Sequence, residues 1–294
     1  MNISRTYKGI ILVALSALFF ALGSVFAKVA IQASNLSGIV MAFSRFFIGF
    51  VIFLVYVIVK KKPLKPNNIK YVLLRAIFNT LAIILFFIGV EYTTITNANM
   101  LNMTYPVFVF LIAPYLNKEQ IKKYYIIFLI LTMIGYYLIV VPDFQNINIG
   151  DVTALISGIV AAVGISALRE ARKYDESYLI ICYLMLIGSL MSFMIILPKL
   201  VIPQPMIAFY MFISGLMGVL GQIFITIGYR YVDAVKGSLV SACRIIFSVI
   251  LGVSIFSDLL SLRIIIGGIL ILISLVGVSG ILDKHMNKHL EKSS

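Results

Sequence analysis

Ten apolar segments run through almost the whole chain, and their length limits it to a fold that sits in lipid. The hydrocarbon core of a bilayer is about 30 Å thick, so a helix that crosses it needs roughly 20 apolar residues. Of the 294 residues, 62% are hydrophobic and 12% are charged, whereas about a quarter of the residues in a soluble domain are charged. We therefore predict an all-α integral membrane protein with ten transmembrane helices, at residues 9–30, 36–59, 71–92, 95–116, 124–141, 150–171, 177–198, 205–230, 235–257 and 262–282.

The sequence also contains an internal duplication. Residues 89–119 match residues 228–258 without a gap, at an offset of 139 positions. Each copy holds five of the ten spans, and because five is odd, the second copy enters the membrane from the opposite side to the first. The prediction is two inverted five-helix repeats, residues 1–141 and residues 142–294, the second ending in a short cytoplasmic tail.

The positive charges predict how the chain is oriented. If the N-terminus is cytoplasmic, nineteen of the 24 basic residues, Arg75 among them, fall on the cytoplasmic side, and only Lys28, Lys199 and Arg263 fall on the other side. Short cytoplasmic loops are enriched in Lys and Arg in this way. We expect a multi-pass protein of the cell membrane with both termini in the cytoplasm. Because the basic residues lie between apolar spans, the net charge of +13 does not indicate nucleic-acid binding.

The fourth span is the richest in polar residues. Asn99, Asn102 and Tyr105 recur every three residues, which places them on one helical face, and they are followed by Pro106. Proline has no N–H, so the carbonyl of Asn102 loses its usual helical partner, and Pro106 is the predicted hinge. The asparagines either line a solute site or only form hydrogen bonds to neighbouring helices.

The duplication places a second polar stripe opposite the first. At the offset of 139, Asn102 aligns with Ser241 and Tyr105 aligns with Arg244. In an inverted repeat the two stripes face each other near the middle of the bilayer. A charge at that depth is costly and is usually functional. Arg244 is therefore predicted to bind a carboxylate or phosphate of a solute; the alternative is that it only ties down backbone carbonyls or tyrosine hydroxyls.

Three further residues are candidates for the same site. Gln222 and Asn79 lie in the middle of apolar spans, and Arg45 either lines a cavity or extends toward a helix end. All eleven acidic residues fall at span ends or in loops, and His285 and His289 lie in the C-terminal tail. The sequence therefore predicts no metal site, no cofactor and no proton relay of Asp, Glu or His at the bilayer midplane.

The chain is similar to the EamA-like family of the drug/metabolite transporter superfamily. The similarity is carried by residues 91–98, by Tyr105-Pro106, by residues 116–119, by Arg45-Phe46 and by the first-helix stretch 23–28. It implies a central cavity lined by the first, third, fourth, sixth, eighth and ninth helices. It also implies transport of amino acids, other small metabolites or drugs, and some members exchange nucleotide sugars or phosphorylated sugars.

Together these features predict a secondary transporter of an amino acid or another anionic or zwitterionic solute, working by alternating access. One alternative is an exchanger of nucleotide- or phosphate-bearing metabolites. Two others belong to different classes: an integral membrane enzyme, which the absence of histidine from every span disfavours, and a non-transporting helical partner protein. The expected partners are a small solute and the lipid bilayer, and the sequence leaves a homodimer open.

Overall fold

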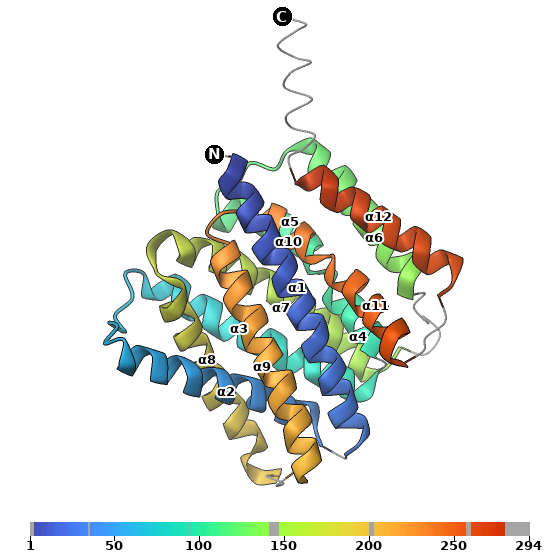
Figure 1. Ribbon diagram of the computed structural model, residues 1–294. Coiled ribbons are helices and arrows are strands. Elements are labelled where there is room, and N and C mark those ends of the chain that lie inside the picture. The colour runs from blue at the N-terminus through green and yellow to red at the C-terminus, as the bar shows by residue number, and fades with distance from the viewer. Residues whose placement is uncertain are drawn as a thin grey trace, which may run out of the picture.

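The computed structural model describes residues 3–34, 36–93, 95–140, 147–199, 203–256 and 260–279. These residues form helices and no strand (Figure 1). The C-terminal tail with its two histidines, and Asp258 in the second copy of the duplication, lie outside the described residues. In chain order the helices are α1 (Ile3–Gln32), α2 (Gly38–Val59), α3 (Ile69–Tyr92), α4 (Ile95–Asn102), α5 (Tyr105–Leu116), α6 (Lys123–Val140), α7 (Ile149–Tyr174), α8 (Ser177–Ile196), the short 3-10 helix η1 (Leu197–Lys199), α9 (Pro205–Gly228), α10 (Ala234–Ser241), α11 (Arg244–Phe256) and α12 (Leu262–Val278).

Eight helical stretches have the length and hydropathy to cross a membrane. Six are single helices, and two are formed by a pair, α4 with α5 and α10 with α11. The helices α6 and α12 are also apolar but shorter. The predicted all-helical membrane protein is thus confirmed. Of the ten predicted spans, eight have full length, and those near residues 124–141 and 262–282 are shorter within the described part of the chain.

Helices from the two halves of the chain pack against each other in pairs. The largest contacts join α3 to α7, α1 to α9, α6 to α12 and α2 to α8. Figure 1 shows α6 and α12 side by side at one edge, with α1 and α9 crossing the middle of the view. The first half therefore does not form a separate bundle, because its helices are buried against the second half.

Two of the membrane-spanning stretches are broken near their middle, at equivalent positions of the duplication. The first break, at residues 103 and 104, separates α4 from α5, and the second, at residues 242 and 243, separates α10 from α11. Both breaks are closed by tighter i→i+3 hydrogen bonds, such as Thr104 N to Leu101 O at 3.3 Å and Ala242 N to Leu239 O at 3.1 Å. Pro106 lies in the first turn of α5, where its missing N–H costs no helical hydrogen bond.

Acidic side chains cap helix starts at both ends of the bundle. Glu91 accepts a hydrogen bond from the backbone N–H of Gly38 at 2.9 Å, at the start of α2. Glu119 accepts one from Ala234 at 2.7 Å, at the start of α10, and Asp175 accepts two, at 2.6 and 3.1 Å, just before α3. A carboxylate is stabilised there because the first N–H groups of a helix have no partner and carry partial positive charge. These carboxylates are therefore used in holding helices together.

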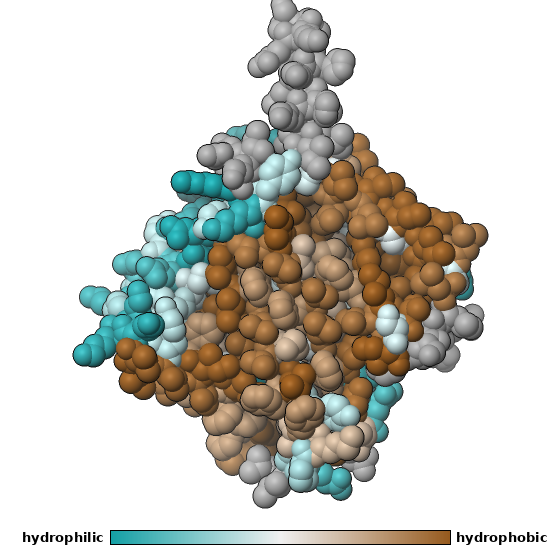
Figure 2. Space-filling model, viewed as in Figure 1, coloured by the Kyte–Doolittle hydropathy of each residue, from teal (hydrophilic) through white to brown (hydrophobic). Residues whose placement is uncertain are grey.

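The surface separates into an apolar band and a polar rim. Figure 2 shows brown, hydrophobic side chains across most of the visible face and teal, hydrophilic ones along its upper left edge. Contacts bring the α2–α3 loop to the end of α7, where Asn67 donates to the carbonyl of Tyr174 at 2.8 Å. The ammonium of Lys8 lies 5.3 Å from the ring centre of Tyr231 at the same rim. A broad apolar band with charge confined to the ends is what a lipid-embedded protein requires.

The α6–α12 pair depends on close backbone approach at two glycines. A Cβ placed on Gly267 would lie 2.6 Å from the carbonyl oxygen of Gly135, whereas a Cβ on the adjacent Gly268 would meet nothing within 4 Å. Thr132 lies one turn before Gly135 in α6 and donates a hydrogen bond of 2.7 Å to Ser274, which lies two turns after Gly267 in α12. Small residues and hydrogen-bonding hydroxyls are the usual means by which membrane helices associate.

We predict that Gly267→Ala destabilises the fold and that Gly268→Ala does not. The added methyl group at position 267 forces the two helices apart, and overpacking of this kind costs about 1–3 kcal/mol. The measurement is thermal unfolding of the detergent-purified variants, followed by circular dichroism. Equal melting temperatures for the two variants would contradict the packing described for α6 and α12.

Candidate functional site

A cavity of about 110 Å³ lies between the two halves of the chain. Its lining comes from α1, α2, α3, α7 and α9 and from both broken helices. These include all six helices that the family resemblance implies, together with α2. The polar side chains in the lining are Ser16, Ser24, Arg45, Arg75, Asn79, Asn102, Tyr105, Ser214, Gln222, Ser241 and Arg244.

Seven of the eight residues proposed from the sequence line this cavity. They are Arg45, Asn79, Asn102, Tyr105, Gln222, Ser241 and Arg244. Asn99 is buried in α4 and is not part of the lining. It lies one turn before the break in the fourth span, while the lining residues of that span, Asn102 to Tyr105, lie around the break itself. Asn99 and Asn102 belong to the same helix, α4, and Asn99 lies one turn farther from the break, beyond the cavity lining.

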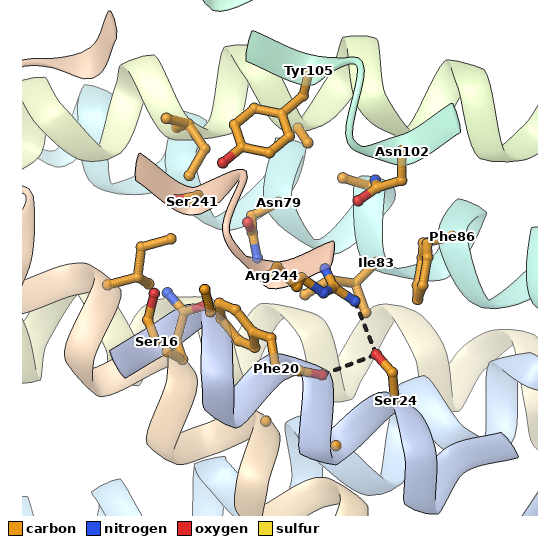
Figure 3. Close-up of a pocket in the computed structure, with 18 of the residues that line it drawn as sticks. Ser16, Phe20, Ser24, Asn79, Ile83, Phe86, Asn102, Tyr105, Ser241 and Arg244 are labelled. Carbon is orange, nitrogen blue, oxygen red and sulfur yellow. Dashed lines mark hydrogen bonds between the residues drawn. The ribbon is translucent and has the colours of Figure 1, made fainter. Parts of the chain in front are cut away.

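Arg244 is the first residue of α11, so the second break presents its side chain to the cavity. Its Nη2 donates a hydrogen bond to Ser24 Oγ at 2.9 Å, and Ser24 donates in turn to the carbonyl of Phe20 at 2.9 Å. Figure 3 shows Arg244 reaching toward Ser24 of α1 and toward Phe86 of α3. The guanidinium carbon lies 5.4 Å from the ring centre of Phe86 and 5.9 Å from that of Phe20. These aromatic faces stabilise the cation, but the buried Nε has no hydrogen-bond partner among the described residues.

Arg45 approaches the cavity from α2. Its guanidinium carbon lies 4.9 Å from the ring centre of Phe20, so one ring is shared with Arg244. The side chain passes over Gly218 of α9, where a Cβ would lie 2.8 Å from its Cδ and Nε. The absence of a side chain at position 218 therefore makes room for Arg45. Of the two predicted alternatives, Arg45 lines the cavity and does not extend to a helix end. Its Nε is also buried without a partner in the described part of the chain.

Arg75 is the functional candidate that the sequence analysis missed. It was counted as a cytoplasmic charge because it lies near the start of its span, but the structure buries it in the cavity wall with 1% of its surface exposed. Neither its Nε nor its Nη1 has a hydrogen-bond partner among the described residues. One signal could have identified it: Arg75 and Asn79 are four residues apart and so share one face of α3.

The uncharged polar residues of the cavity are mostly engaged within the protein. The amide of Asn102 donates to Ser157 Oγ at 2.8 Å, and that of Gln222 donates to Thr226 Oγ1 at 3.1 Å. Ser241 donates to the carbonyl of Gly237 at 3.0 Å. These bonds fix the cavity wall. Among the described lining residues, the groups with unused hydrogen-bonding capacity are the three guanidiniums and the amide nitrogen of Asn79.

A bundle of apolar helices around a polar, positively charged cavity defines a membrane protein that binds a small solute inside the bilayer. The sequence model of the EamA-like transporter family matches residues 7–141 and again residues 148–280. The chain belongs to this family, and it is a multi-pass membrane transporter of a small solute.

Individual relatives are distant. An uncharacterized transporter of Helicobacter pylori (strain J99) is 26% identical over 223 residues, covering 72% of this chain and 74% of the relative. The pseudopaline exporter CntI of Pseudomonas aeruginosa (strain UCBPP-PA14) is 22% identical over 92% of this chain and 95% of its own length. A solved crystal structure superposes with a TM-score of 0.75 at 15% identity, covering 96% of this chain and 98% of that chain, which shows a shared fold.

We predict that a cysteine at position 24 is reactive in the folded protein and that one at position 157 is not. Ser24 lines the cavity, whereas Ser157 is fully buried beside Asn102 outside it. A thiolate at position 24 is also stabilised by Arg244, which raises its reactivity. The measurement is maleimide labelling of Ser24→Cys and Ser157→Cys before and after unfolding, with the native thiols of Cys182 and Cys243, both buried, replaced by alanine. We expect a difference of at least about tenfold, and equal rates would mean that the cavity is closed to solutes.

Proposed function

We propose that the chain is a secondary transporter that moves a compact anionic or zwitterionic metabolite, such as an amino acid, by alternating access around the central cavity. One observation carries the proposal: three arginines converge on a cavity inside the bilayer with part of their hydrogen-bonding capacity unused. An uncompensated charge in hydrocarbon costs several kcal/mol. A buried charge with this energetic cost is typical of a site that binds and releases a solute.

The proposed architecture is ten membrane crossings in two inverted repeats, residues 1–141 and 142–294. The two family matches, at 7–141 and 148–280, support this division. The packing supports it too, because exchanging the halves turns the α1–α9 contact into the α7–α3 contact and leaves the α2–α8 and α6–α12 contacts in place. The shorter helices α6 and α12 reach the lower end, about 17 residues, of the length that can cross a bilayer.

In this scheme the two halves rock about the broken helices. The breaks at residues 103–104 and 242–243 align in the duplication and both border the cavity. Irregular backbone is tolerated at membrane depth where it lines a cavity. Pro106, the second residue after the first break, is the proposed hinge. The proposed solute contacts are the polar lining residues Arg244, Arg45, Asn79, Asn102, Tyr105, Gln222 and Ser241. We add Arg75 because it lines the same cavity, and we leave out Asn99 because it does not.

The cavity size supports a small solute over a nucleotide-bearing one. A typical site for a drug-sized ligand occupies roughly 300–1,000 Å³, and this cavity occupies about 110 Å³. Membership of a transporter family, with a transporter and an exporter among the relatives, favours transport over an enzymatic role. We propose the cell membrane as the location, with both termini in the cytoplasm, because the bias of basic residues supports that orientation.

The proposed inversion predicts that Lys65 and Ile147 face opposite sides of the membrane. Lys65 is exposed in the loop between α2 and α3, and Ile147 is exposed just before α7. Lys65→Cys and Ile147→Cys, each in a background without Cys182 and Cys243, are treated in intact cells with an impermeant thiol reagent. We expect labelling of position 147 only, with position 65 labelled after the cells are opened. Labelling of both positions from the same side would refute the inverted arrangement.

Arg244→Ala is expected to reduce transport by about 10- to 100-fold, which corresponds to the loss of one hydrogen bond to a charged group. The measurement is uptake of radiolabelled anionic and zwitterionic metabolites into proteoliposomes. Arg263→Ala is the matched control, because Arg263 is an exposed arginine on α12 outside the cavity lining. Wild-type rates for Arg244→Ala with every transported solute would remove Arg244 from the site.

A further inference from the structure

The charge of the cavity is unbalanced. Its lining contains three arginines and, among the described residues, no aspartate, glutamate or histidine. The three guanidiniums are close enough to influence one another, since Arg45 lies within electrostatic range of both Arg244 and Arg75. The only side-chain hydrogen bond to these groups in the described residues is the one from Arg244 to the neutral hydroxyl of Ser24. The described residues therefore supply three positive charges to the cavity and no negative charge.

Five carboxylates of the described residues are engaged away from the cavity. Glu91, Glu119 and Asp175 cap helix starts at the ends of the bundle. Asp233 pairs with Arg169 at 3.1 Å, and Glu170 pairs with Lys173 at 2.6 Å. Breaking any of these contacts to reach the cavity would leave a helix end or a cation without its partner. Within the described residues the cavity therefore lacks a counter-charge, and a bound anion would supply one.

The arginines form two groups inside the cavity. Arg45 and Arg244 share the ring of Phe20, at 4.9 and 5.9 Å. Among the described residues Arg75 shares no ring with these two, and its Nε and Nη1 are buried without a hydrogen-bond partner. A guanidinium binds a carboxylate or phosphate through two parallel hydrogen bonds. Two separate positions for anionic groups follow from this arrangement.

We infer that the transported solute carries at least two anionic groups, carboxylate or phosphate, on a short skeleton, one held by Arg45 and Arg244 and the other by Arg75. This inference rests on the proposed function and narrows its solute class. A zwitterionic amino acid fits less well, because the cavity offers its ammonium group no anionic partner among the described residues. A monoanion leaves two positive charges uncompensated, whereas a dianion or trianion neutralises most or all of the excess.

The test is equilibrium binding to the purified protein in nanodiscs, using a matched pair of probes. Succinate is a dianion, and succinamate is nearly the same shape with one carboxylate replaced by an amide. The panel adds citrate and 3-phosphoglycerate, which separate carboxylate from phosphate recognition, and alanine as a zwitterion. We expect succinate or another dianion to bind at least tenfold more tightly than succinamate and alanine. Equal or tighter binding of succinamate or alanine, or no binding of any dianion, overturns the inference.

Variants of Arg75 assign the second position. Arg75→Met is expected to reduce the ratio of succinate to succinamate affinity at least tenfold while changing succinamate affinity little. A purely structural role for Arg75 would lower both affinities together. Arg75→Lys is the second variant if Arg75→Met does not fold. It keeps the positive charge but not the planar guanidinium, so we expect an intermediate ratio of succinate to succinamate affinity. An unchanged ratio in either folded variant overturns the assignment of Arg75. Arg263→Met is the control outside the cavity.

Transport by the same protein separates this inference from the proposed function. If dianions bind selectively but no member of the panel crosses proteoliposome membranes by uptake or counterflow, the transporter proposal fails while the anion site stands. If alanine is transported and dianions neither bind nor compete with it, the transporter proposal stands and the dianion inference fails.

Discussion

The structure depends on where charged side chains lie in a part of the protein that is surrounded by lipid. A guanidinium inside a bilayer is tolerated only if it is paired, faces a cavity or reaches the interface. Arg45, Arg75 and Arg244 face one cavity, and two of them rest against the ring of Phe20. The carboxylates of Glu91, Glu119 and Asp175 have a different role, because they accept hydrogen bonds at helix starts at the ends of the bundle. These carboxylates thus stabilise the helix ends, whereas the cavity arginines remain available to bind a solute.

The breaks between α4 and α5 and between α10 and α11 connect this charge arrangement to the backbone. Arg244 immediately follows the second break, and Tyr105, its equivalent in the duplication, immediately follows the first. Because a break ends one helix and begins another at the middle of the membrane, the residue after it projects into the space between the halves. The room for these side chains comes from small residues on facing helices, as Gly218 shows for Arg45.

Much of this could be predicted from the sequence, and the exceptions have physical reasons. The hydropathy of the sequence predicted the helices. The polar residues in the middle of apolar spans included seven that line the cavity. The first break lies next to Pro106, which signals it, whereas the second break has Ile245 in the equivalent place and no local signal. Arg75 was missed because distance from a span end does not say which face of a helix is buried. Asn99 was included because its spacing places it on the same helical face as Asn102, but spacing does not show how far along that face the cavity extends.

The most direct test of the account is the structure of the protein in nanodiscs, determined by electron cryo-microscopy with a saturating dicarboxylate. The account predicts density for the solute between the guanidiniums of Arg45, Arg244 and Arg75, with its carboxylates within hydrogen-bonding distance of their nitrogens. A structure in which those guanidiniums instead pair with acidic side chains of the protein or with lipid phosphates, and the cavity excludes the solute, would contradict it.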